Sequence, residues 1–271
     1  MSKRLTSRAL IARDLERIGV TPGSVVIVHS AMSELDYLPG GEQALLLALR
    51  DSVGSGATIV TPAQSWHLCD PAYLADPEVP ESWWPDIRAA LPSYDAATTP
   101  SRAMGLLAEA VRVHPESLRS PHPHRSFAAI GPAAERIVAR HDLDDPVGEG
   151  SPLAILYELR ASVLLLGVGY AACTALHLAG SRSGTVAERV ANGAPLLVDG
   201  EQRWVTFDEP SVRDADFPQA GVAFEADLPD DVSIGMVGGA DARLVAMRSL
   251  VDYCADWMRD HRDRVLPPRQ G

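Results

Sequence analysis

Lysine is almost absent from this 271-residue chain: Lys3 is the only one, and arginine supplies every other basic side chain. Lysine and arginine number 24 against 36 acidic residues, so the formal net charge is −12. Nucleic-acid-binding proteins need a basic surface, and anionic membranes attract basic segments. The charge balance therefore argues against both partners. The acidity serves either solubility or the capture of a cationic substrate, since a cleft lined with charges of one sign concentrates ions of the opposite charge.

Cysteine and long apolar runs are also scarce. Cys69, Cys173 and Cys254 are too scattered for a disulfide framework and form no CxxC pair, so we expect reduced thiols. No apolar run approaches the ~18 residues of a membrane-spanning helix, and the N-terminus lacks the core of a signal peptide. With 46% hydrophobic residues available for a core, these absences predict a folded cytoplasmic protein.

The first part of the chain alternates between helical and strand periodicity. Apolar spacing predicts a helix over 6–19, then a strand over 24–28, a helix over 42–53 and a strand over 58–61. Strand, helix and strand in this order indicate a βαβ unit and a parallel or mixed sheet. We find no internal repeat and no flexible linker. The sequence therefore predicts one α/β domain over 1–271, with a central mixed sheet flanked by helices.

Residues 62–100 differ, because prolines recur among tryptophans and tyrosines and preclude long regular elements. A long loop of this kind either shapes a substrate site or simply packs on the sheet. Farther on, Asp199-Gly200 predicts a type I′ hairpin within a β-rich acidic region over 194–239. The other predicted elements are helices over 99–114, 133–141, 151–159 and 240–259, a turn and short strand over 119–131, an extended segment at 222–225, and a frayed tail at 267–271.

The strongest chemical signal is an apolar strand that ends at Gly167 and Gly169 and is followed by a short helix. Thr174 and His177 lie three residues apart on this helix and therefore share a face. Ligands bind at the carboxyl ends of strands in such sheets, and histidine titrates near neutral pH. The alternative is a core histidine bonded to a backbone carbonyl.

Two other classes of site are disfavoured. The chain has no GxSxG elbow of a serine hydrolase. His122 and His124 form an HxH pair, but no carboxylate or cysteine stands at supporting spacing and there is no HExxH. The sequence therefore predicts no metal.

Several motifs in order resemble the aminoglycoside 3-N-acetyltransferases over residues ~5 to ~258. The motifs are 27–33 (IVHSAMS) with Gly40-Gly41, 80–84 (PESWW), 99–105 (TPSRAMG), 120–129 (SPHPHRSFAA), 166–177 (LGVGYAACTALH) and 216–217 (DF). This resemblance implies an α/β fold distinct from the GCN5-like acetyltransferases. It also implies transfer of the acetyl group of acetyl-CoA to the 3-amino group of the 2-deoxystreptamine ring, which inactivates antibiotics such as gentamicin, kanamycin and neomycin.

The resemblance also implies roles for particular residues. His177 becomes the general base, and Thr174 assists at the thioester carbonyl. Glu225 or Asp216 becomes the carboxylate that orients the imidazole. The residues implied in coenzyme binding are Ser30, Ala31, Met32, Ser33, Thr99, Ser101 and Arg102. Those implied in binding the cationic antibiotic are Asp70, Trp66, Asp208 and Asp214.

The chain departs from the family pattern at Ala31 and at Ala171-Ala172-Cys173, which leaves the range of substrates open. One alternative is an acetyltransferase of the same family that acts on another, biosynthetic amine. A second is a non-catalytic CoA- or aminoglycoside-binding protein. The arginine- and alanine-rich composition suggests a GC-rich bacterial genome. A monomer and a homodimer, and a resistance and a self-protection role, are all compatible with the sequence.

Overall fold

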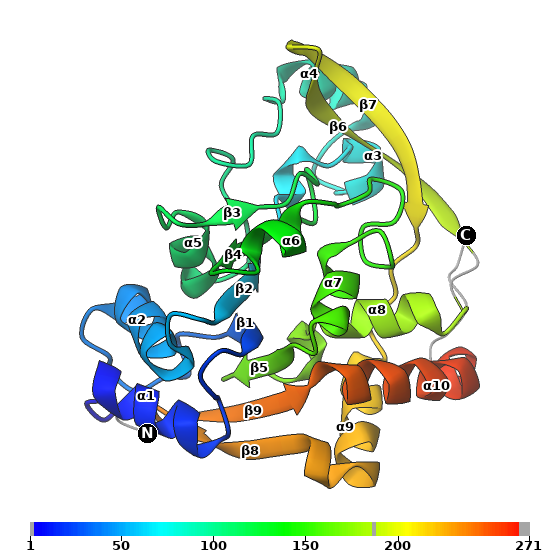
Figure 1. The fold of residues 1–271 in the computed structure, drawn as a ribbon. Coiled ribbons are helices and arrows are strands. Elements are labelled where there is room, and N and C mark those ends of the chain that lie inside the picture. The colour runs from blue at the N-terminus through cyan, green and yellow to red at the C-terminus, as the bar shows by residue number, and fades with distance from the viewer. Residues whose placement is uncertain (1–2, 186–187, 266–271) are drawn as a thin grey trace.

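The computed structural model describes residues 3–185 and 188–265, and within them seven strands form one sheet. The strands are β1 (Val25–Ser30), β2 (Thr58–Pro62), β3 (Leu118–Arg119), β4 (Phe127–Ile130), β5 (Ser162–Leu166), β8 (Val232–Val237) and β9 (Ala240–Ala246), in the order β3-β4-β2-β1-β5-β9-β8 (Figure 1). Strand β1 pairs in parallel with β2 and β5, and the other neighbours are antiparallel. The prediction of a mixed α/β sheet is confirmed.

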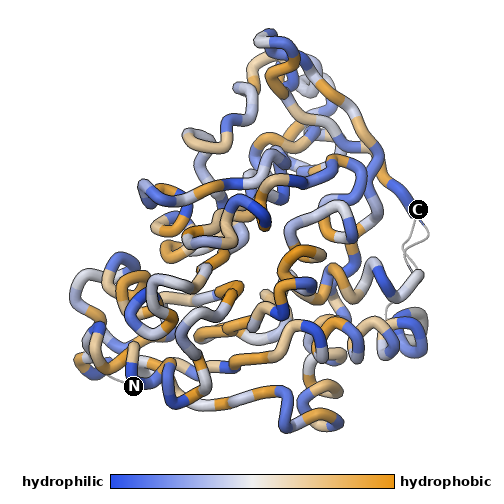
Figure 2. Tube along the Cα trace, viewed as in Figure 1, coloured by the Kyte–Doolittle hydropathy of each residue, from blue (hydrophilic) through white to orange (hydrophobic). Residues whose placement is uncertain are grey.

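Helices cover both faces of the sheet. One layer contains α1 (Arg8–Arg17), α2 (Gly41–Val53) and α5 (Leu106–Arg112); the other contains α6 (Ala134–Val138), α7 (Pro152–Glu158), α8 (Ala175–Arg182), α9 (Phe217–Asp227) and α10 (Met247–Val265). Alternate strand residues enter the two cores: Val26 and Val28 face α1 and α2, whereas Ile27 faces α8 and α10. Figure 2 shows the resulting concentration of hydrophobic residues along the central strands. A sheet buried on both faces explains why β5 reads as a continuous apolar run.

The hairpin of β6 (Arg189–Val198) and β7 (Glu201–Pro210) forms a separate two-stranded sheet that projects from the body (Figure 1). Its turn has positive φ at Asp199 (53°) and Gly200 (81°), as a type I′ turn requires. The predicted hairpin is confirmed, with strands longer than expected.

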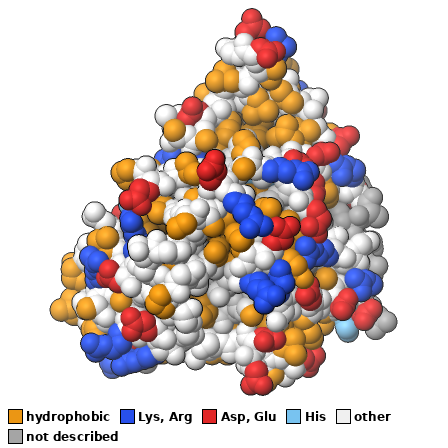
Figure 3. Space-filling model, viewed as in Figure 1, with side chains coloured by type: hydrophobic (Ala, Val, Ile, Leu, Met, Phe, Trp, Pro, Cys, Tyr) orange, Lys and Arg blue, Asp and Glu red, His pale blue; other side chains and the backbone are white. Residues whose placement is uncertain are grey.

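Residues 62–100 contain only short helical segments among the described residues: η1 (Trp66–Leu68), α3 (Pro71–Leu74), η2 (Glu81–Trp83) and α4 (Trp84–Ala90). They pack on the hairpin, where the Tyr94 N–H donates to the Pro195 carbonyl (2.9 Å) and the Gln202 amide donates to the Leu91 carbonyl (3.0 Å). On the face shown in Figure 3, hydrophobic side chains gather over this arm, while acidic and basic side chains are interspersed below it.

Two predicted helices begin too early. The helix predicted over 99–114 is wrong in its first turns, because α5 begins only at Leu106. Ala103 (φ 60°) and Gly105 (φ 85°) hold the preceding segment in left-handed backbone conformations, which interrupt a helix. The final helix, predicted from Ala240, begins at Met247 because residues 240–246 form β9.

The C-terminal region also contains a strand pair that the sequence reading did not predict. Gly238 (φ 54°) and Gly239 (φ 86°) make the tight turn between β8 and β9. Residues 222–225, expected to be extended in the β-rich region, lie inside α9, where Phe224 packs into the core. The predicted frayed tail at 267–271 lies outside the described residues. In the described part of the chain, no helix combines the length and apolar character needed to cross a membrane.

Candidate active site

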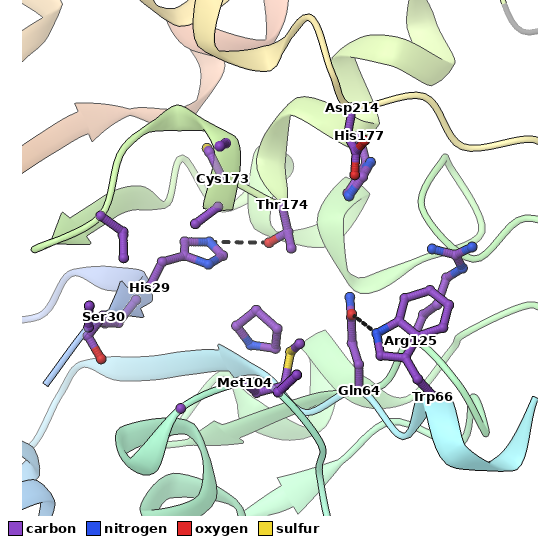
Figure 4. Close-up of a pocket in the computed structure, with 18 of the residues that line it drawn as sticks. His29, Ser30, Gln64, Trp66, Met104, Arg125, Cys173, Thr174, His177 and Asp214 are labelled. Atoms are coloured by element: carbon purple, nitrogen blue, oxygen red, sulfur yellow. Dashed lines mark hydrogen bonds between the residues drawn. The ribbon is translucent and has the colours of Figure 1, made fainter. Parts of the chain in front are cut away.

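The largest cavity described, about 820 Å³, opens at the carboxyl ends of β1 and β5. These strands are parallel neighbours, with His29 opposite Leu165 and Ser30 opposite Leu166, so the residues that follow each strand meet at one edge of the sheet. Figure 4 shows that His29 comes from the end of β1, whereas Thr174 and His177 come from the segment after β5. The cavity therefore lies where open α/β sheets bind ligands.

Thr174 and His29 form a buried contact in the wall of this cavity. After β5 the chain turns through Gly167 (φ 67°) and η3 (Tyr170–Ala172), and Thr174 occupies the N-cap position of α8. The Thr174 Oγ1 lies 3.2 Å from the His29 Nε2 (Figure 4). Burial lowers the pKa of His29 to about 4, which leaves this imidazole neutral at pH 7. The sequence reading did not single out His29.

His177 lines the same cavity, one helical turn after Thr174. Burial, followed by the nearby cations Arg125 and Arg262, lowers the pKa of His177 to about 3. Its ring packs edge-on against Phe217 with the ring centroids 4.9 Å apart, and it makes no side-chain hydrogen bond to another described residue. The imidazole is therefore neutral at pH 7 and has a nitrogen lone pair free to accept a proton.

The two carboxylates predicted to orient His177 are held by arginines instead. Asp216 is fully buried and makes a bidentate pair with Arg262, at 2.7 Å to Nε and 3.1 Å to Nη2. Glu225 accepts a hydrogen bond from Arg243 Nε at 2.6 Å. Within the described structure, neither carboxylate bonds to His177. Both carboxylates are engaged by arginines, and the expected direct contact with His177 is not formed.

One end of the cavity carries aromatic and charged side chains from the 62–100 segment and from residues near 125 and 214 (Figure 4). Arg125 is buried and stacks over the Trp66 ring, 4.6 Å from its centroid. It donates to the Tyr73 hydroxyl (2.7 Å) and pairs with Glu209 (3.2 Å). Asp214 is exposed on the same wall.

The other end is formed by the turn after β1 and by the segment that leads into α5. Ser30, Ala31, Met32 and Ser33 all line it, opposite residues 103–106. Gly105 permits this approach, since a Cβ there would lie 3.3 Å from the Ser30 carbonyl oxygen. The Lys3 ammonium donates to the Ser33 carbonyl (2.8 Å), so the only lysine lies at this end.

Three residues implied in coenzyme binding do not line the cavity. The Thr99 hydroxyl accepts from the Asp95 N–H (2.9 Å), and the Ser101 hydroxyl donates to Glu109 (2.6 Å). Arg102 is exposed just before the cavity-lining residues, and its N–H donates to the Gln64 carbonyl.

The residues implied in antibiotic binding divide between two cavities. Trp66 and Asp214 line the central one. Asp70 and Asp208 line a neighbouring cavity of about 370 Å³ beside the hairpin. Asp70 caps α3 and pairs with Arg88 at 2.8 Å, so its charge is already neutralised, whereas Asp208 is exposed.

Sequence reasoning gave no role to three cavity residues, Gln64, Tyr73 and Arg125, and placed His29 only at the start of the turn suited to the coenzyme. Gln64 accepts from the Trp66 indole N–H at 2.8 Å. Arg125 stands in the motif at 120–129, yet its partner Glu209 is 84 residues away, and no local pattern signals such a pair. The end of β1 offered a usable signal, because His29 directly follows the apolar run 25–28 of this strand.

A neutral imidazole in a cavity whose two ends carry different side chains is suited to a group-transfer enzyme that holds donor and acceptor together. Residues 27–259 match the family described as aminoglycoside 3-N-acetyltransferase, and the chain belongs to this family. It is accordingly an acyltransferase.

Known relatives cover almost the whole chain. The SPbeta prophage-derived aminoglycoside N(3′)-acetyltransferase-like protein YokD of Bacillus subtilis (strain 168) is 39% identical over 91% of this chain and 90% of its own length. The crystal structure of YokD matches with a TM-score of 0.92, covering 98% of this chain and 97% of YokD. Aminoglycoside N(3)-acetyltransferase VII of Streptomyces paromomycinus is 36% identical, with 97% and 94% coverage.

The similar structures include complexes with ligands. AAC-IIIb was solved as a binary complex with CoASH and matches with a TM-score of 0.81 at 28% identity, covering 98% of this chain and all of that one. AAC-VIa was solved bound to sisomicin and matches with a TM-score of 0.79 at 28% identity, with 95% and 98% coverage.

Proposed function

We propose that this acyltransferase moves the acetyl group of acetyl-CoA to the 3-amino group of the 2-deoxystreptamine ring of aminoglycoside antibiotics. The observation that carries the proposal is a single cavity that neutral His177 lines together with the serines of the turn after β1 and with Asp214. The CoASH complex of AAC-IIIb and the sisomicin complex of AAC-VIa support the two ligands.

The donor fits the end formed by Ser30 to Ser33. This turn offers two serine hydroxyls and backbone N–H groups, and Lys3 adds a positive charge beside Ser33. Such groups bind the pyrophosphate of a coenzyme. Met104 and the small residues Ala171 and Ala172 line the same cavity and give a thioester arm an apolar path to Thr174.

The acceptor fits the opposite end. Aminoglycosides carry several ammonium groups, and Asp214 offers a carboxylate with no side-chain hydrogen bond to a described residue. Trp66 and Gln64 supply an aromatic edge and an amide for the hydroxyl-bearing rings. The ion pair with Glu209 reduces the repulsion between Arg125 and a cationic substrate.

The chemistry then follows from the two histidines. The acceptor amine attacks the thioester carbonyl carbon and passes a proton to His177, while the C–N bond forms and the C–S bond breaks. The proton finally neutralises the departing CoA thiolate. If His29 donates its Nε2–H to Thr174 Oγ1, the Thr174 hydroxyl hydrogen is free to stabilise the oxyanion.

Direct transfer is favoured over an acetyl-enzyme intermediate. Cys173 lines the cavity next to Thr174, but burial raises the pKa of its thiol to about 12. The thiolate is the reactive nucleophile of cysteine, so Cys173 stays protonated and inert at pH 7. Since acetyl-CoA is an intracellular metabolite, we place the reaction in the bacterial cytoplasm, where it would confer resistance or self-protection.

Thiol release from acetyl-CoA tests this function with gentamicin, kanamycin and paromomycin as acceptors, and NMR of the product locates the acetyl group. We expect turnover, acetylation at the 3-amino group, and loss of turnover in His177→Ala. CoA binding without modification of any aminoglycoside would instead favour the biosynthetic amine as substrate. Normal turnover by His177→Ala would overturn the mechanism.

A further inference from the structure

A second, much smaller cavity adjoins the substrate cavity at His177. Its volume is about 20 Å³, and His177 borders both spaces. To hold one water molecule, a cavity needs a volume of about 10–15 Å³ and two to four polar partners. The residues around this cavity with polar side chains are Asp145, His177, Ser181, Ser211, Arg213 and Arg262. The space therefore suits one water and nothing larger.

Ser211 indicates that this space is built for a polar ligand. Its side chain is 4% exposed, and its Oγ has no hydrogen-bond partner among the described residues. A buried hydroxyl left without a hydrogen-bond partner destabilises the fold. A water in the cavity that Ser211 borders removes this destabilisation.

Asp145 brings a carboxylate to the same space. Its Oδ2 accepts from the Gly150 N–H at 2.7 Å, and its Oδ1 makes no hydrogen bond to a described residue. Gly148 leaves room for this arrangement, because a Cβ there would lie 2.2 Å from Asp145 Oδ1 and 2.6 Å from Ser181 Oγ. Arg262, by contrast, is already bound to Asp216.

We propose that one water in this cavity accepts the ring N–H of His177 and donates to Ser211 and Asp145, so that both act as positioning residues for the imidazole. The inference rests on the role proposed above for His177 as the base. The nitrogen that faces the substrate is then kept free of its proton, as a base requires.

The relay supplies what neither predicted carboxylate does. A water places the charge of Asp145 one molecule away from the ring, so the ring N–H is oriented while Asp216 remains paired with Arg262. Ordered buried waters bridge polar groups almost as well as direct hydrogen bonds. Ser211 and Asp145 each lie within 34 residues of His177 in the sequence. They stand on separate loops, and only folding brings them to one cavity.

Three variants test the relay. Ser211→Ala removes the hydroxyl, Asp145→Asn removes the charge and keeps the shape, and Ser52→Ala is the matched control. Ser52 is a buried serine on α2, bonded to the Ala12 and Ala48 carbonyls on the other face of the sheet. The measurements are ordered solvent in high-resolution crystal structures, the ¹⁵N shifts of the His177 ring, and kcat and KM for gentamicin.

In the wild-type protein we expect one ordered water within hydrogen-bond distance of the His177 ring and Ser211, and ¹⁵N shifts of a single neutral tautomer. Ser211→Ala and Asp145→Asn should mix the tautomers and lower kcat about 5- to 10-fold with KM unchanged, the effect of one lost hydrogen bond. Ser52→Ala should leave the ring shifts and kcat at wild-type values.

A site without water, or ring shifts in Ser211→Ala identical to the wild type, would overturn the relay. These two measurements do not depend on turnover, so they decide the relay even if aminoglycosides prove not to be substrates. Conversely, an active wild type and an inactive His177→Ala, together with an unaffected Ser211→Ala, would leave the proposed function intact and remove only the relay.

Discussion

The protein contains two groups of histidines that lie in different surroundings. His29 and His177 border the substrate cavity, whereas His122, His124 and His141 lie beneath the hairpin, with ring centroids of His122 and His141 4.7 Å apart. Burial lowers the pKa of all five below the usual value. A shifted pKa therefore does not separate the two groups.

Hydrogen bonding separates His177 from the other four, each of which uses at least one ring nitrogen, although His122 Nε2 has no partner among the described residues. His141 uses both ring nitrogens, at 2.8 Å from the Pro146 carbonyl oxygen and 2.9 Å from Ser120 Oγ. His124 contacts the Leu68 carbonyl oxygen and the Asn192 amide, and His122 Nδ1 accepts two backbone N–H groups. The ring of His177 has no such partner in the described structure. A histidine whose nitrogens are unoccupied beside a cavity is available for proton transfer, and one whose nitrogens are occupied holds the fold together.

The largest effect should come from replacing one histidine of each group with glutamine. His177→Gln should lower kcat/KM about 10²–10⁴-fold, because it removes a general base, with little change in the free energy of unfolding. His141→Gln should leave kcat/KM within about 3-fold and lower the free energy of unfolding by about 1–3 kcal/mol through lost buried hydrogen bonds. Steady-state kinetics and urea unfolding check both. A large kinetic loss in His141→Gln would erase the distinction.

Arg125 joins the two regions, since it lines the cavity and pairs with Glu209 on strand β7 of the hairpin. Glu209→Gln leaves a buried cation unpaired and should destabilise the fold by about 3–5 kcal/mol. The matched control is Glu201→Gln, which breaks the exposed pair with Arg203 and should cost no more than about 1 kcal/mol. Equal unfolding midpoints for the two variants in urea would show that the hairpin does not depend on the buried pair.

Local signals were sufficient for most of the sheet and for one wall of the site. The apolar runs of β1 and β5 and the glycines after β5 predicted the strands and the position of Thr174 and His177. The β8–β9 pair was predictable in retrospect, because Gly238-Gly239 between two alternating runs is a hairpin signal. A helical pattern read from Ala240 obscured it, since the apolar residues of β9 run directly into those of α10.

The partners of the site residues were not predictable, for a physical reason. Asp216 meets Arg262 and Glu209 meets Arg125 across 46 and 84 residues of sequence. Such pairs depend on how separate elements pack, and no periodicity or spacing records them. The same holds for the contact of His29 with Thr174. His29 stands at the end of β1, Thr174 follows the parallel strand β5, and the two residues are 145 positions apart in the sequence.

The histidines beneath the hairpin should make the free energy of unfolding sensitive to mild acid. The pKa of His141 is about 4 in the folded state, with burial as the main cause, and near 6.5 in the unfolded chain. Between these values the unfolded chain binds more protons, so stability is complete above pH 6.5 and is lost as the pH falls toward 4, by about 3 kcal/mol for this residue. Urea unfolding at stepped pH should show a shallower dependence in His141→Gln. An unchanged slope would mean that His141 titrates normally in the folded protein.

The smallest expected effect concerns the acidic residues of the two cavities. Asp214→Asn should raise KM for gentamicin about 3- to 5-fold at low salt and leave KM for acetyl-CoA unchanged, because an exposed carboxylate attracts the cationic acceptor only modestly. The effect should shrink at 0.5 M salt, where screening acts within about 4 Å. Asp208→Asn, in the neighbouring cavity, is the control and should change KM less. If both variants raise KM equally, the antibiotic reaches past the central cavity to the base of the hairpin, and the region that holds the fold together also binds substrate.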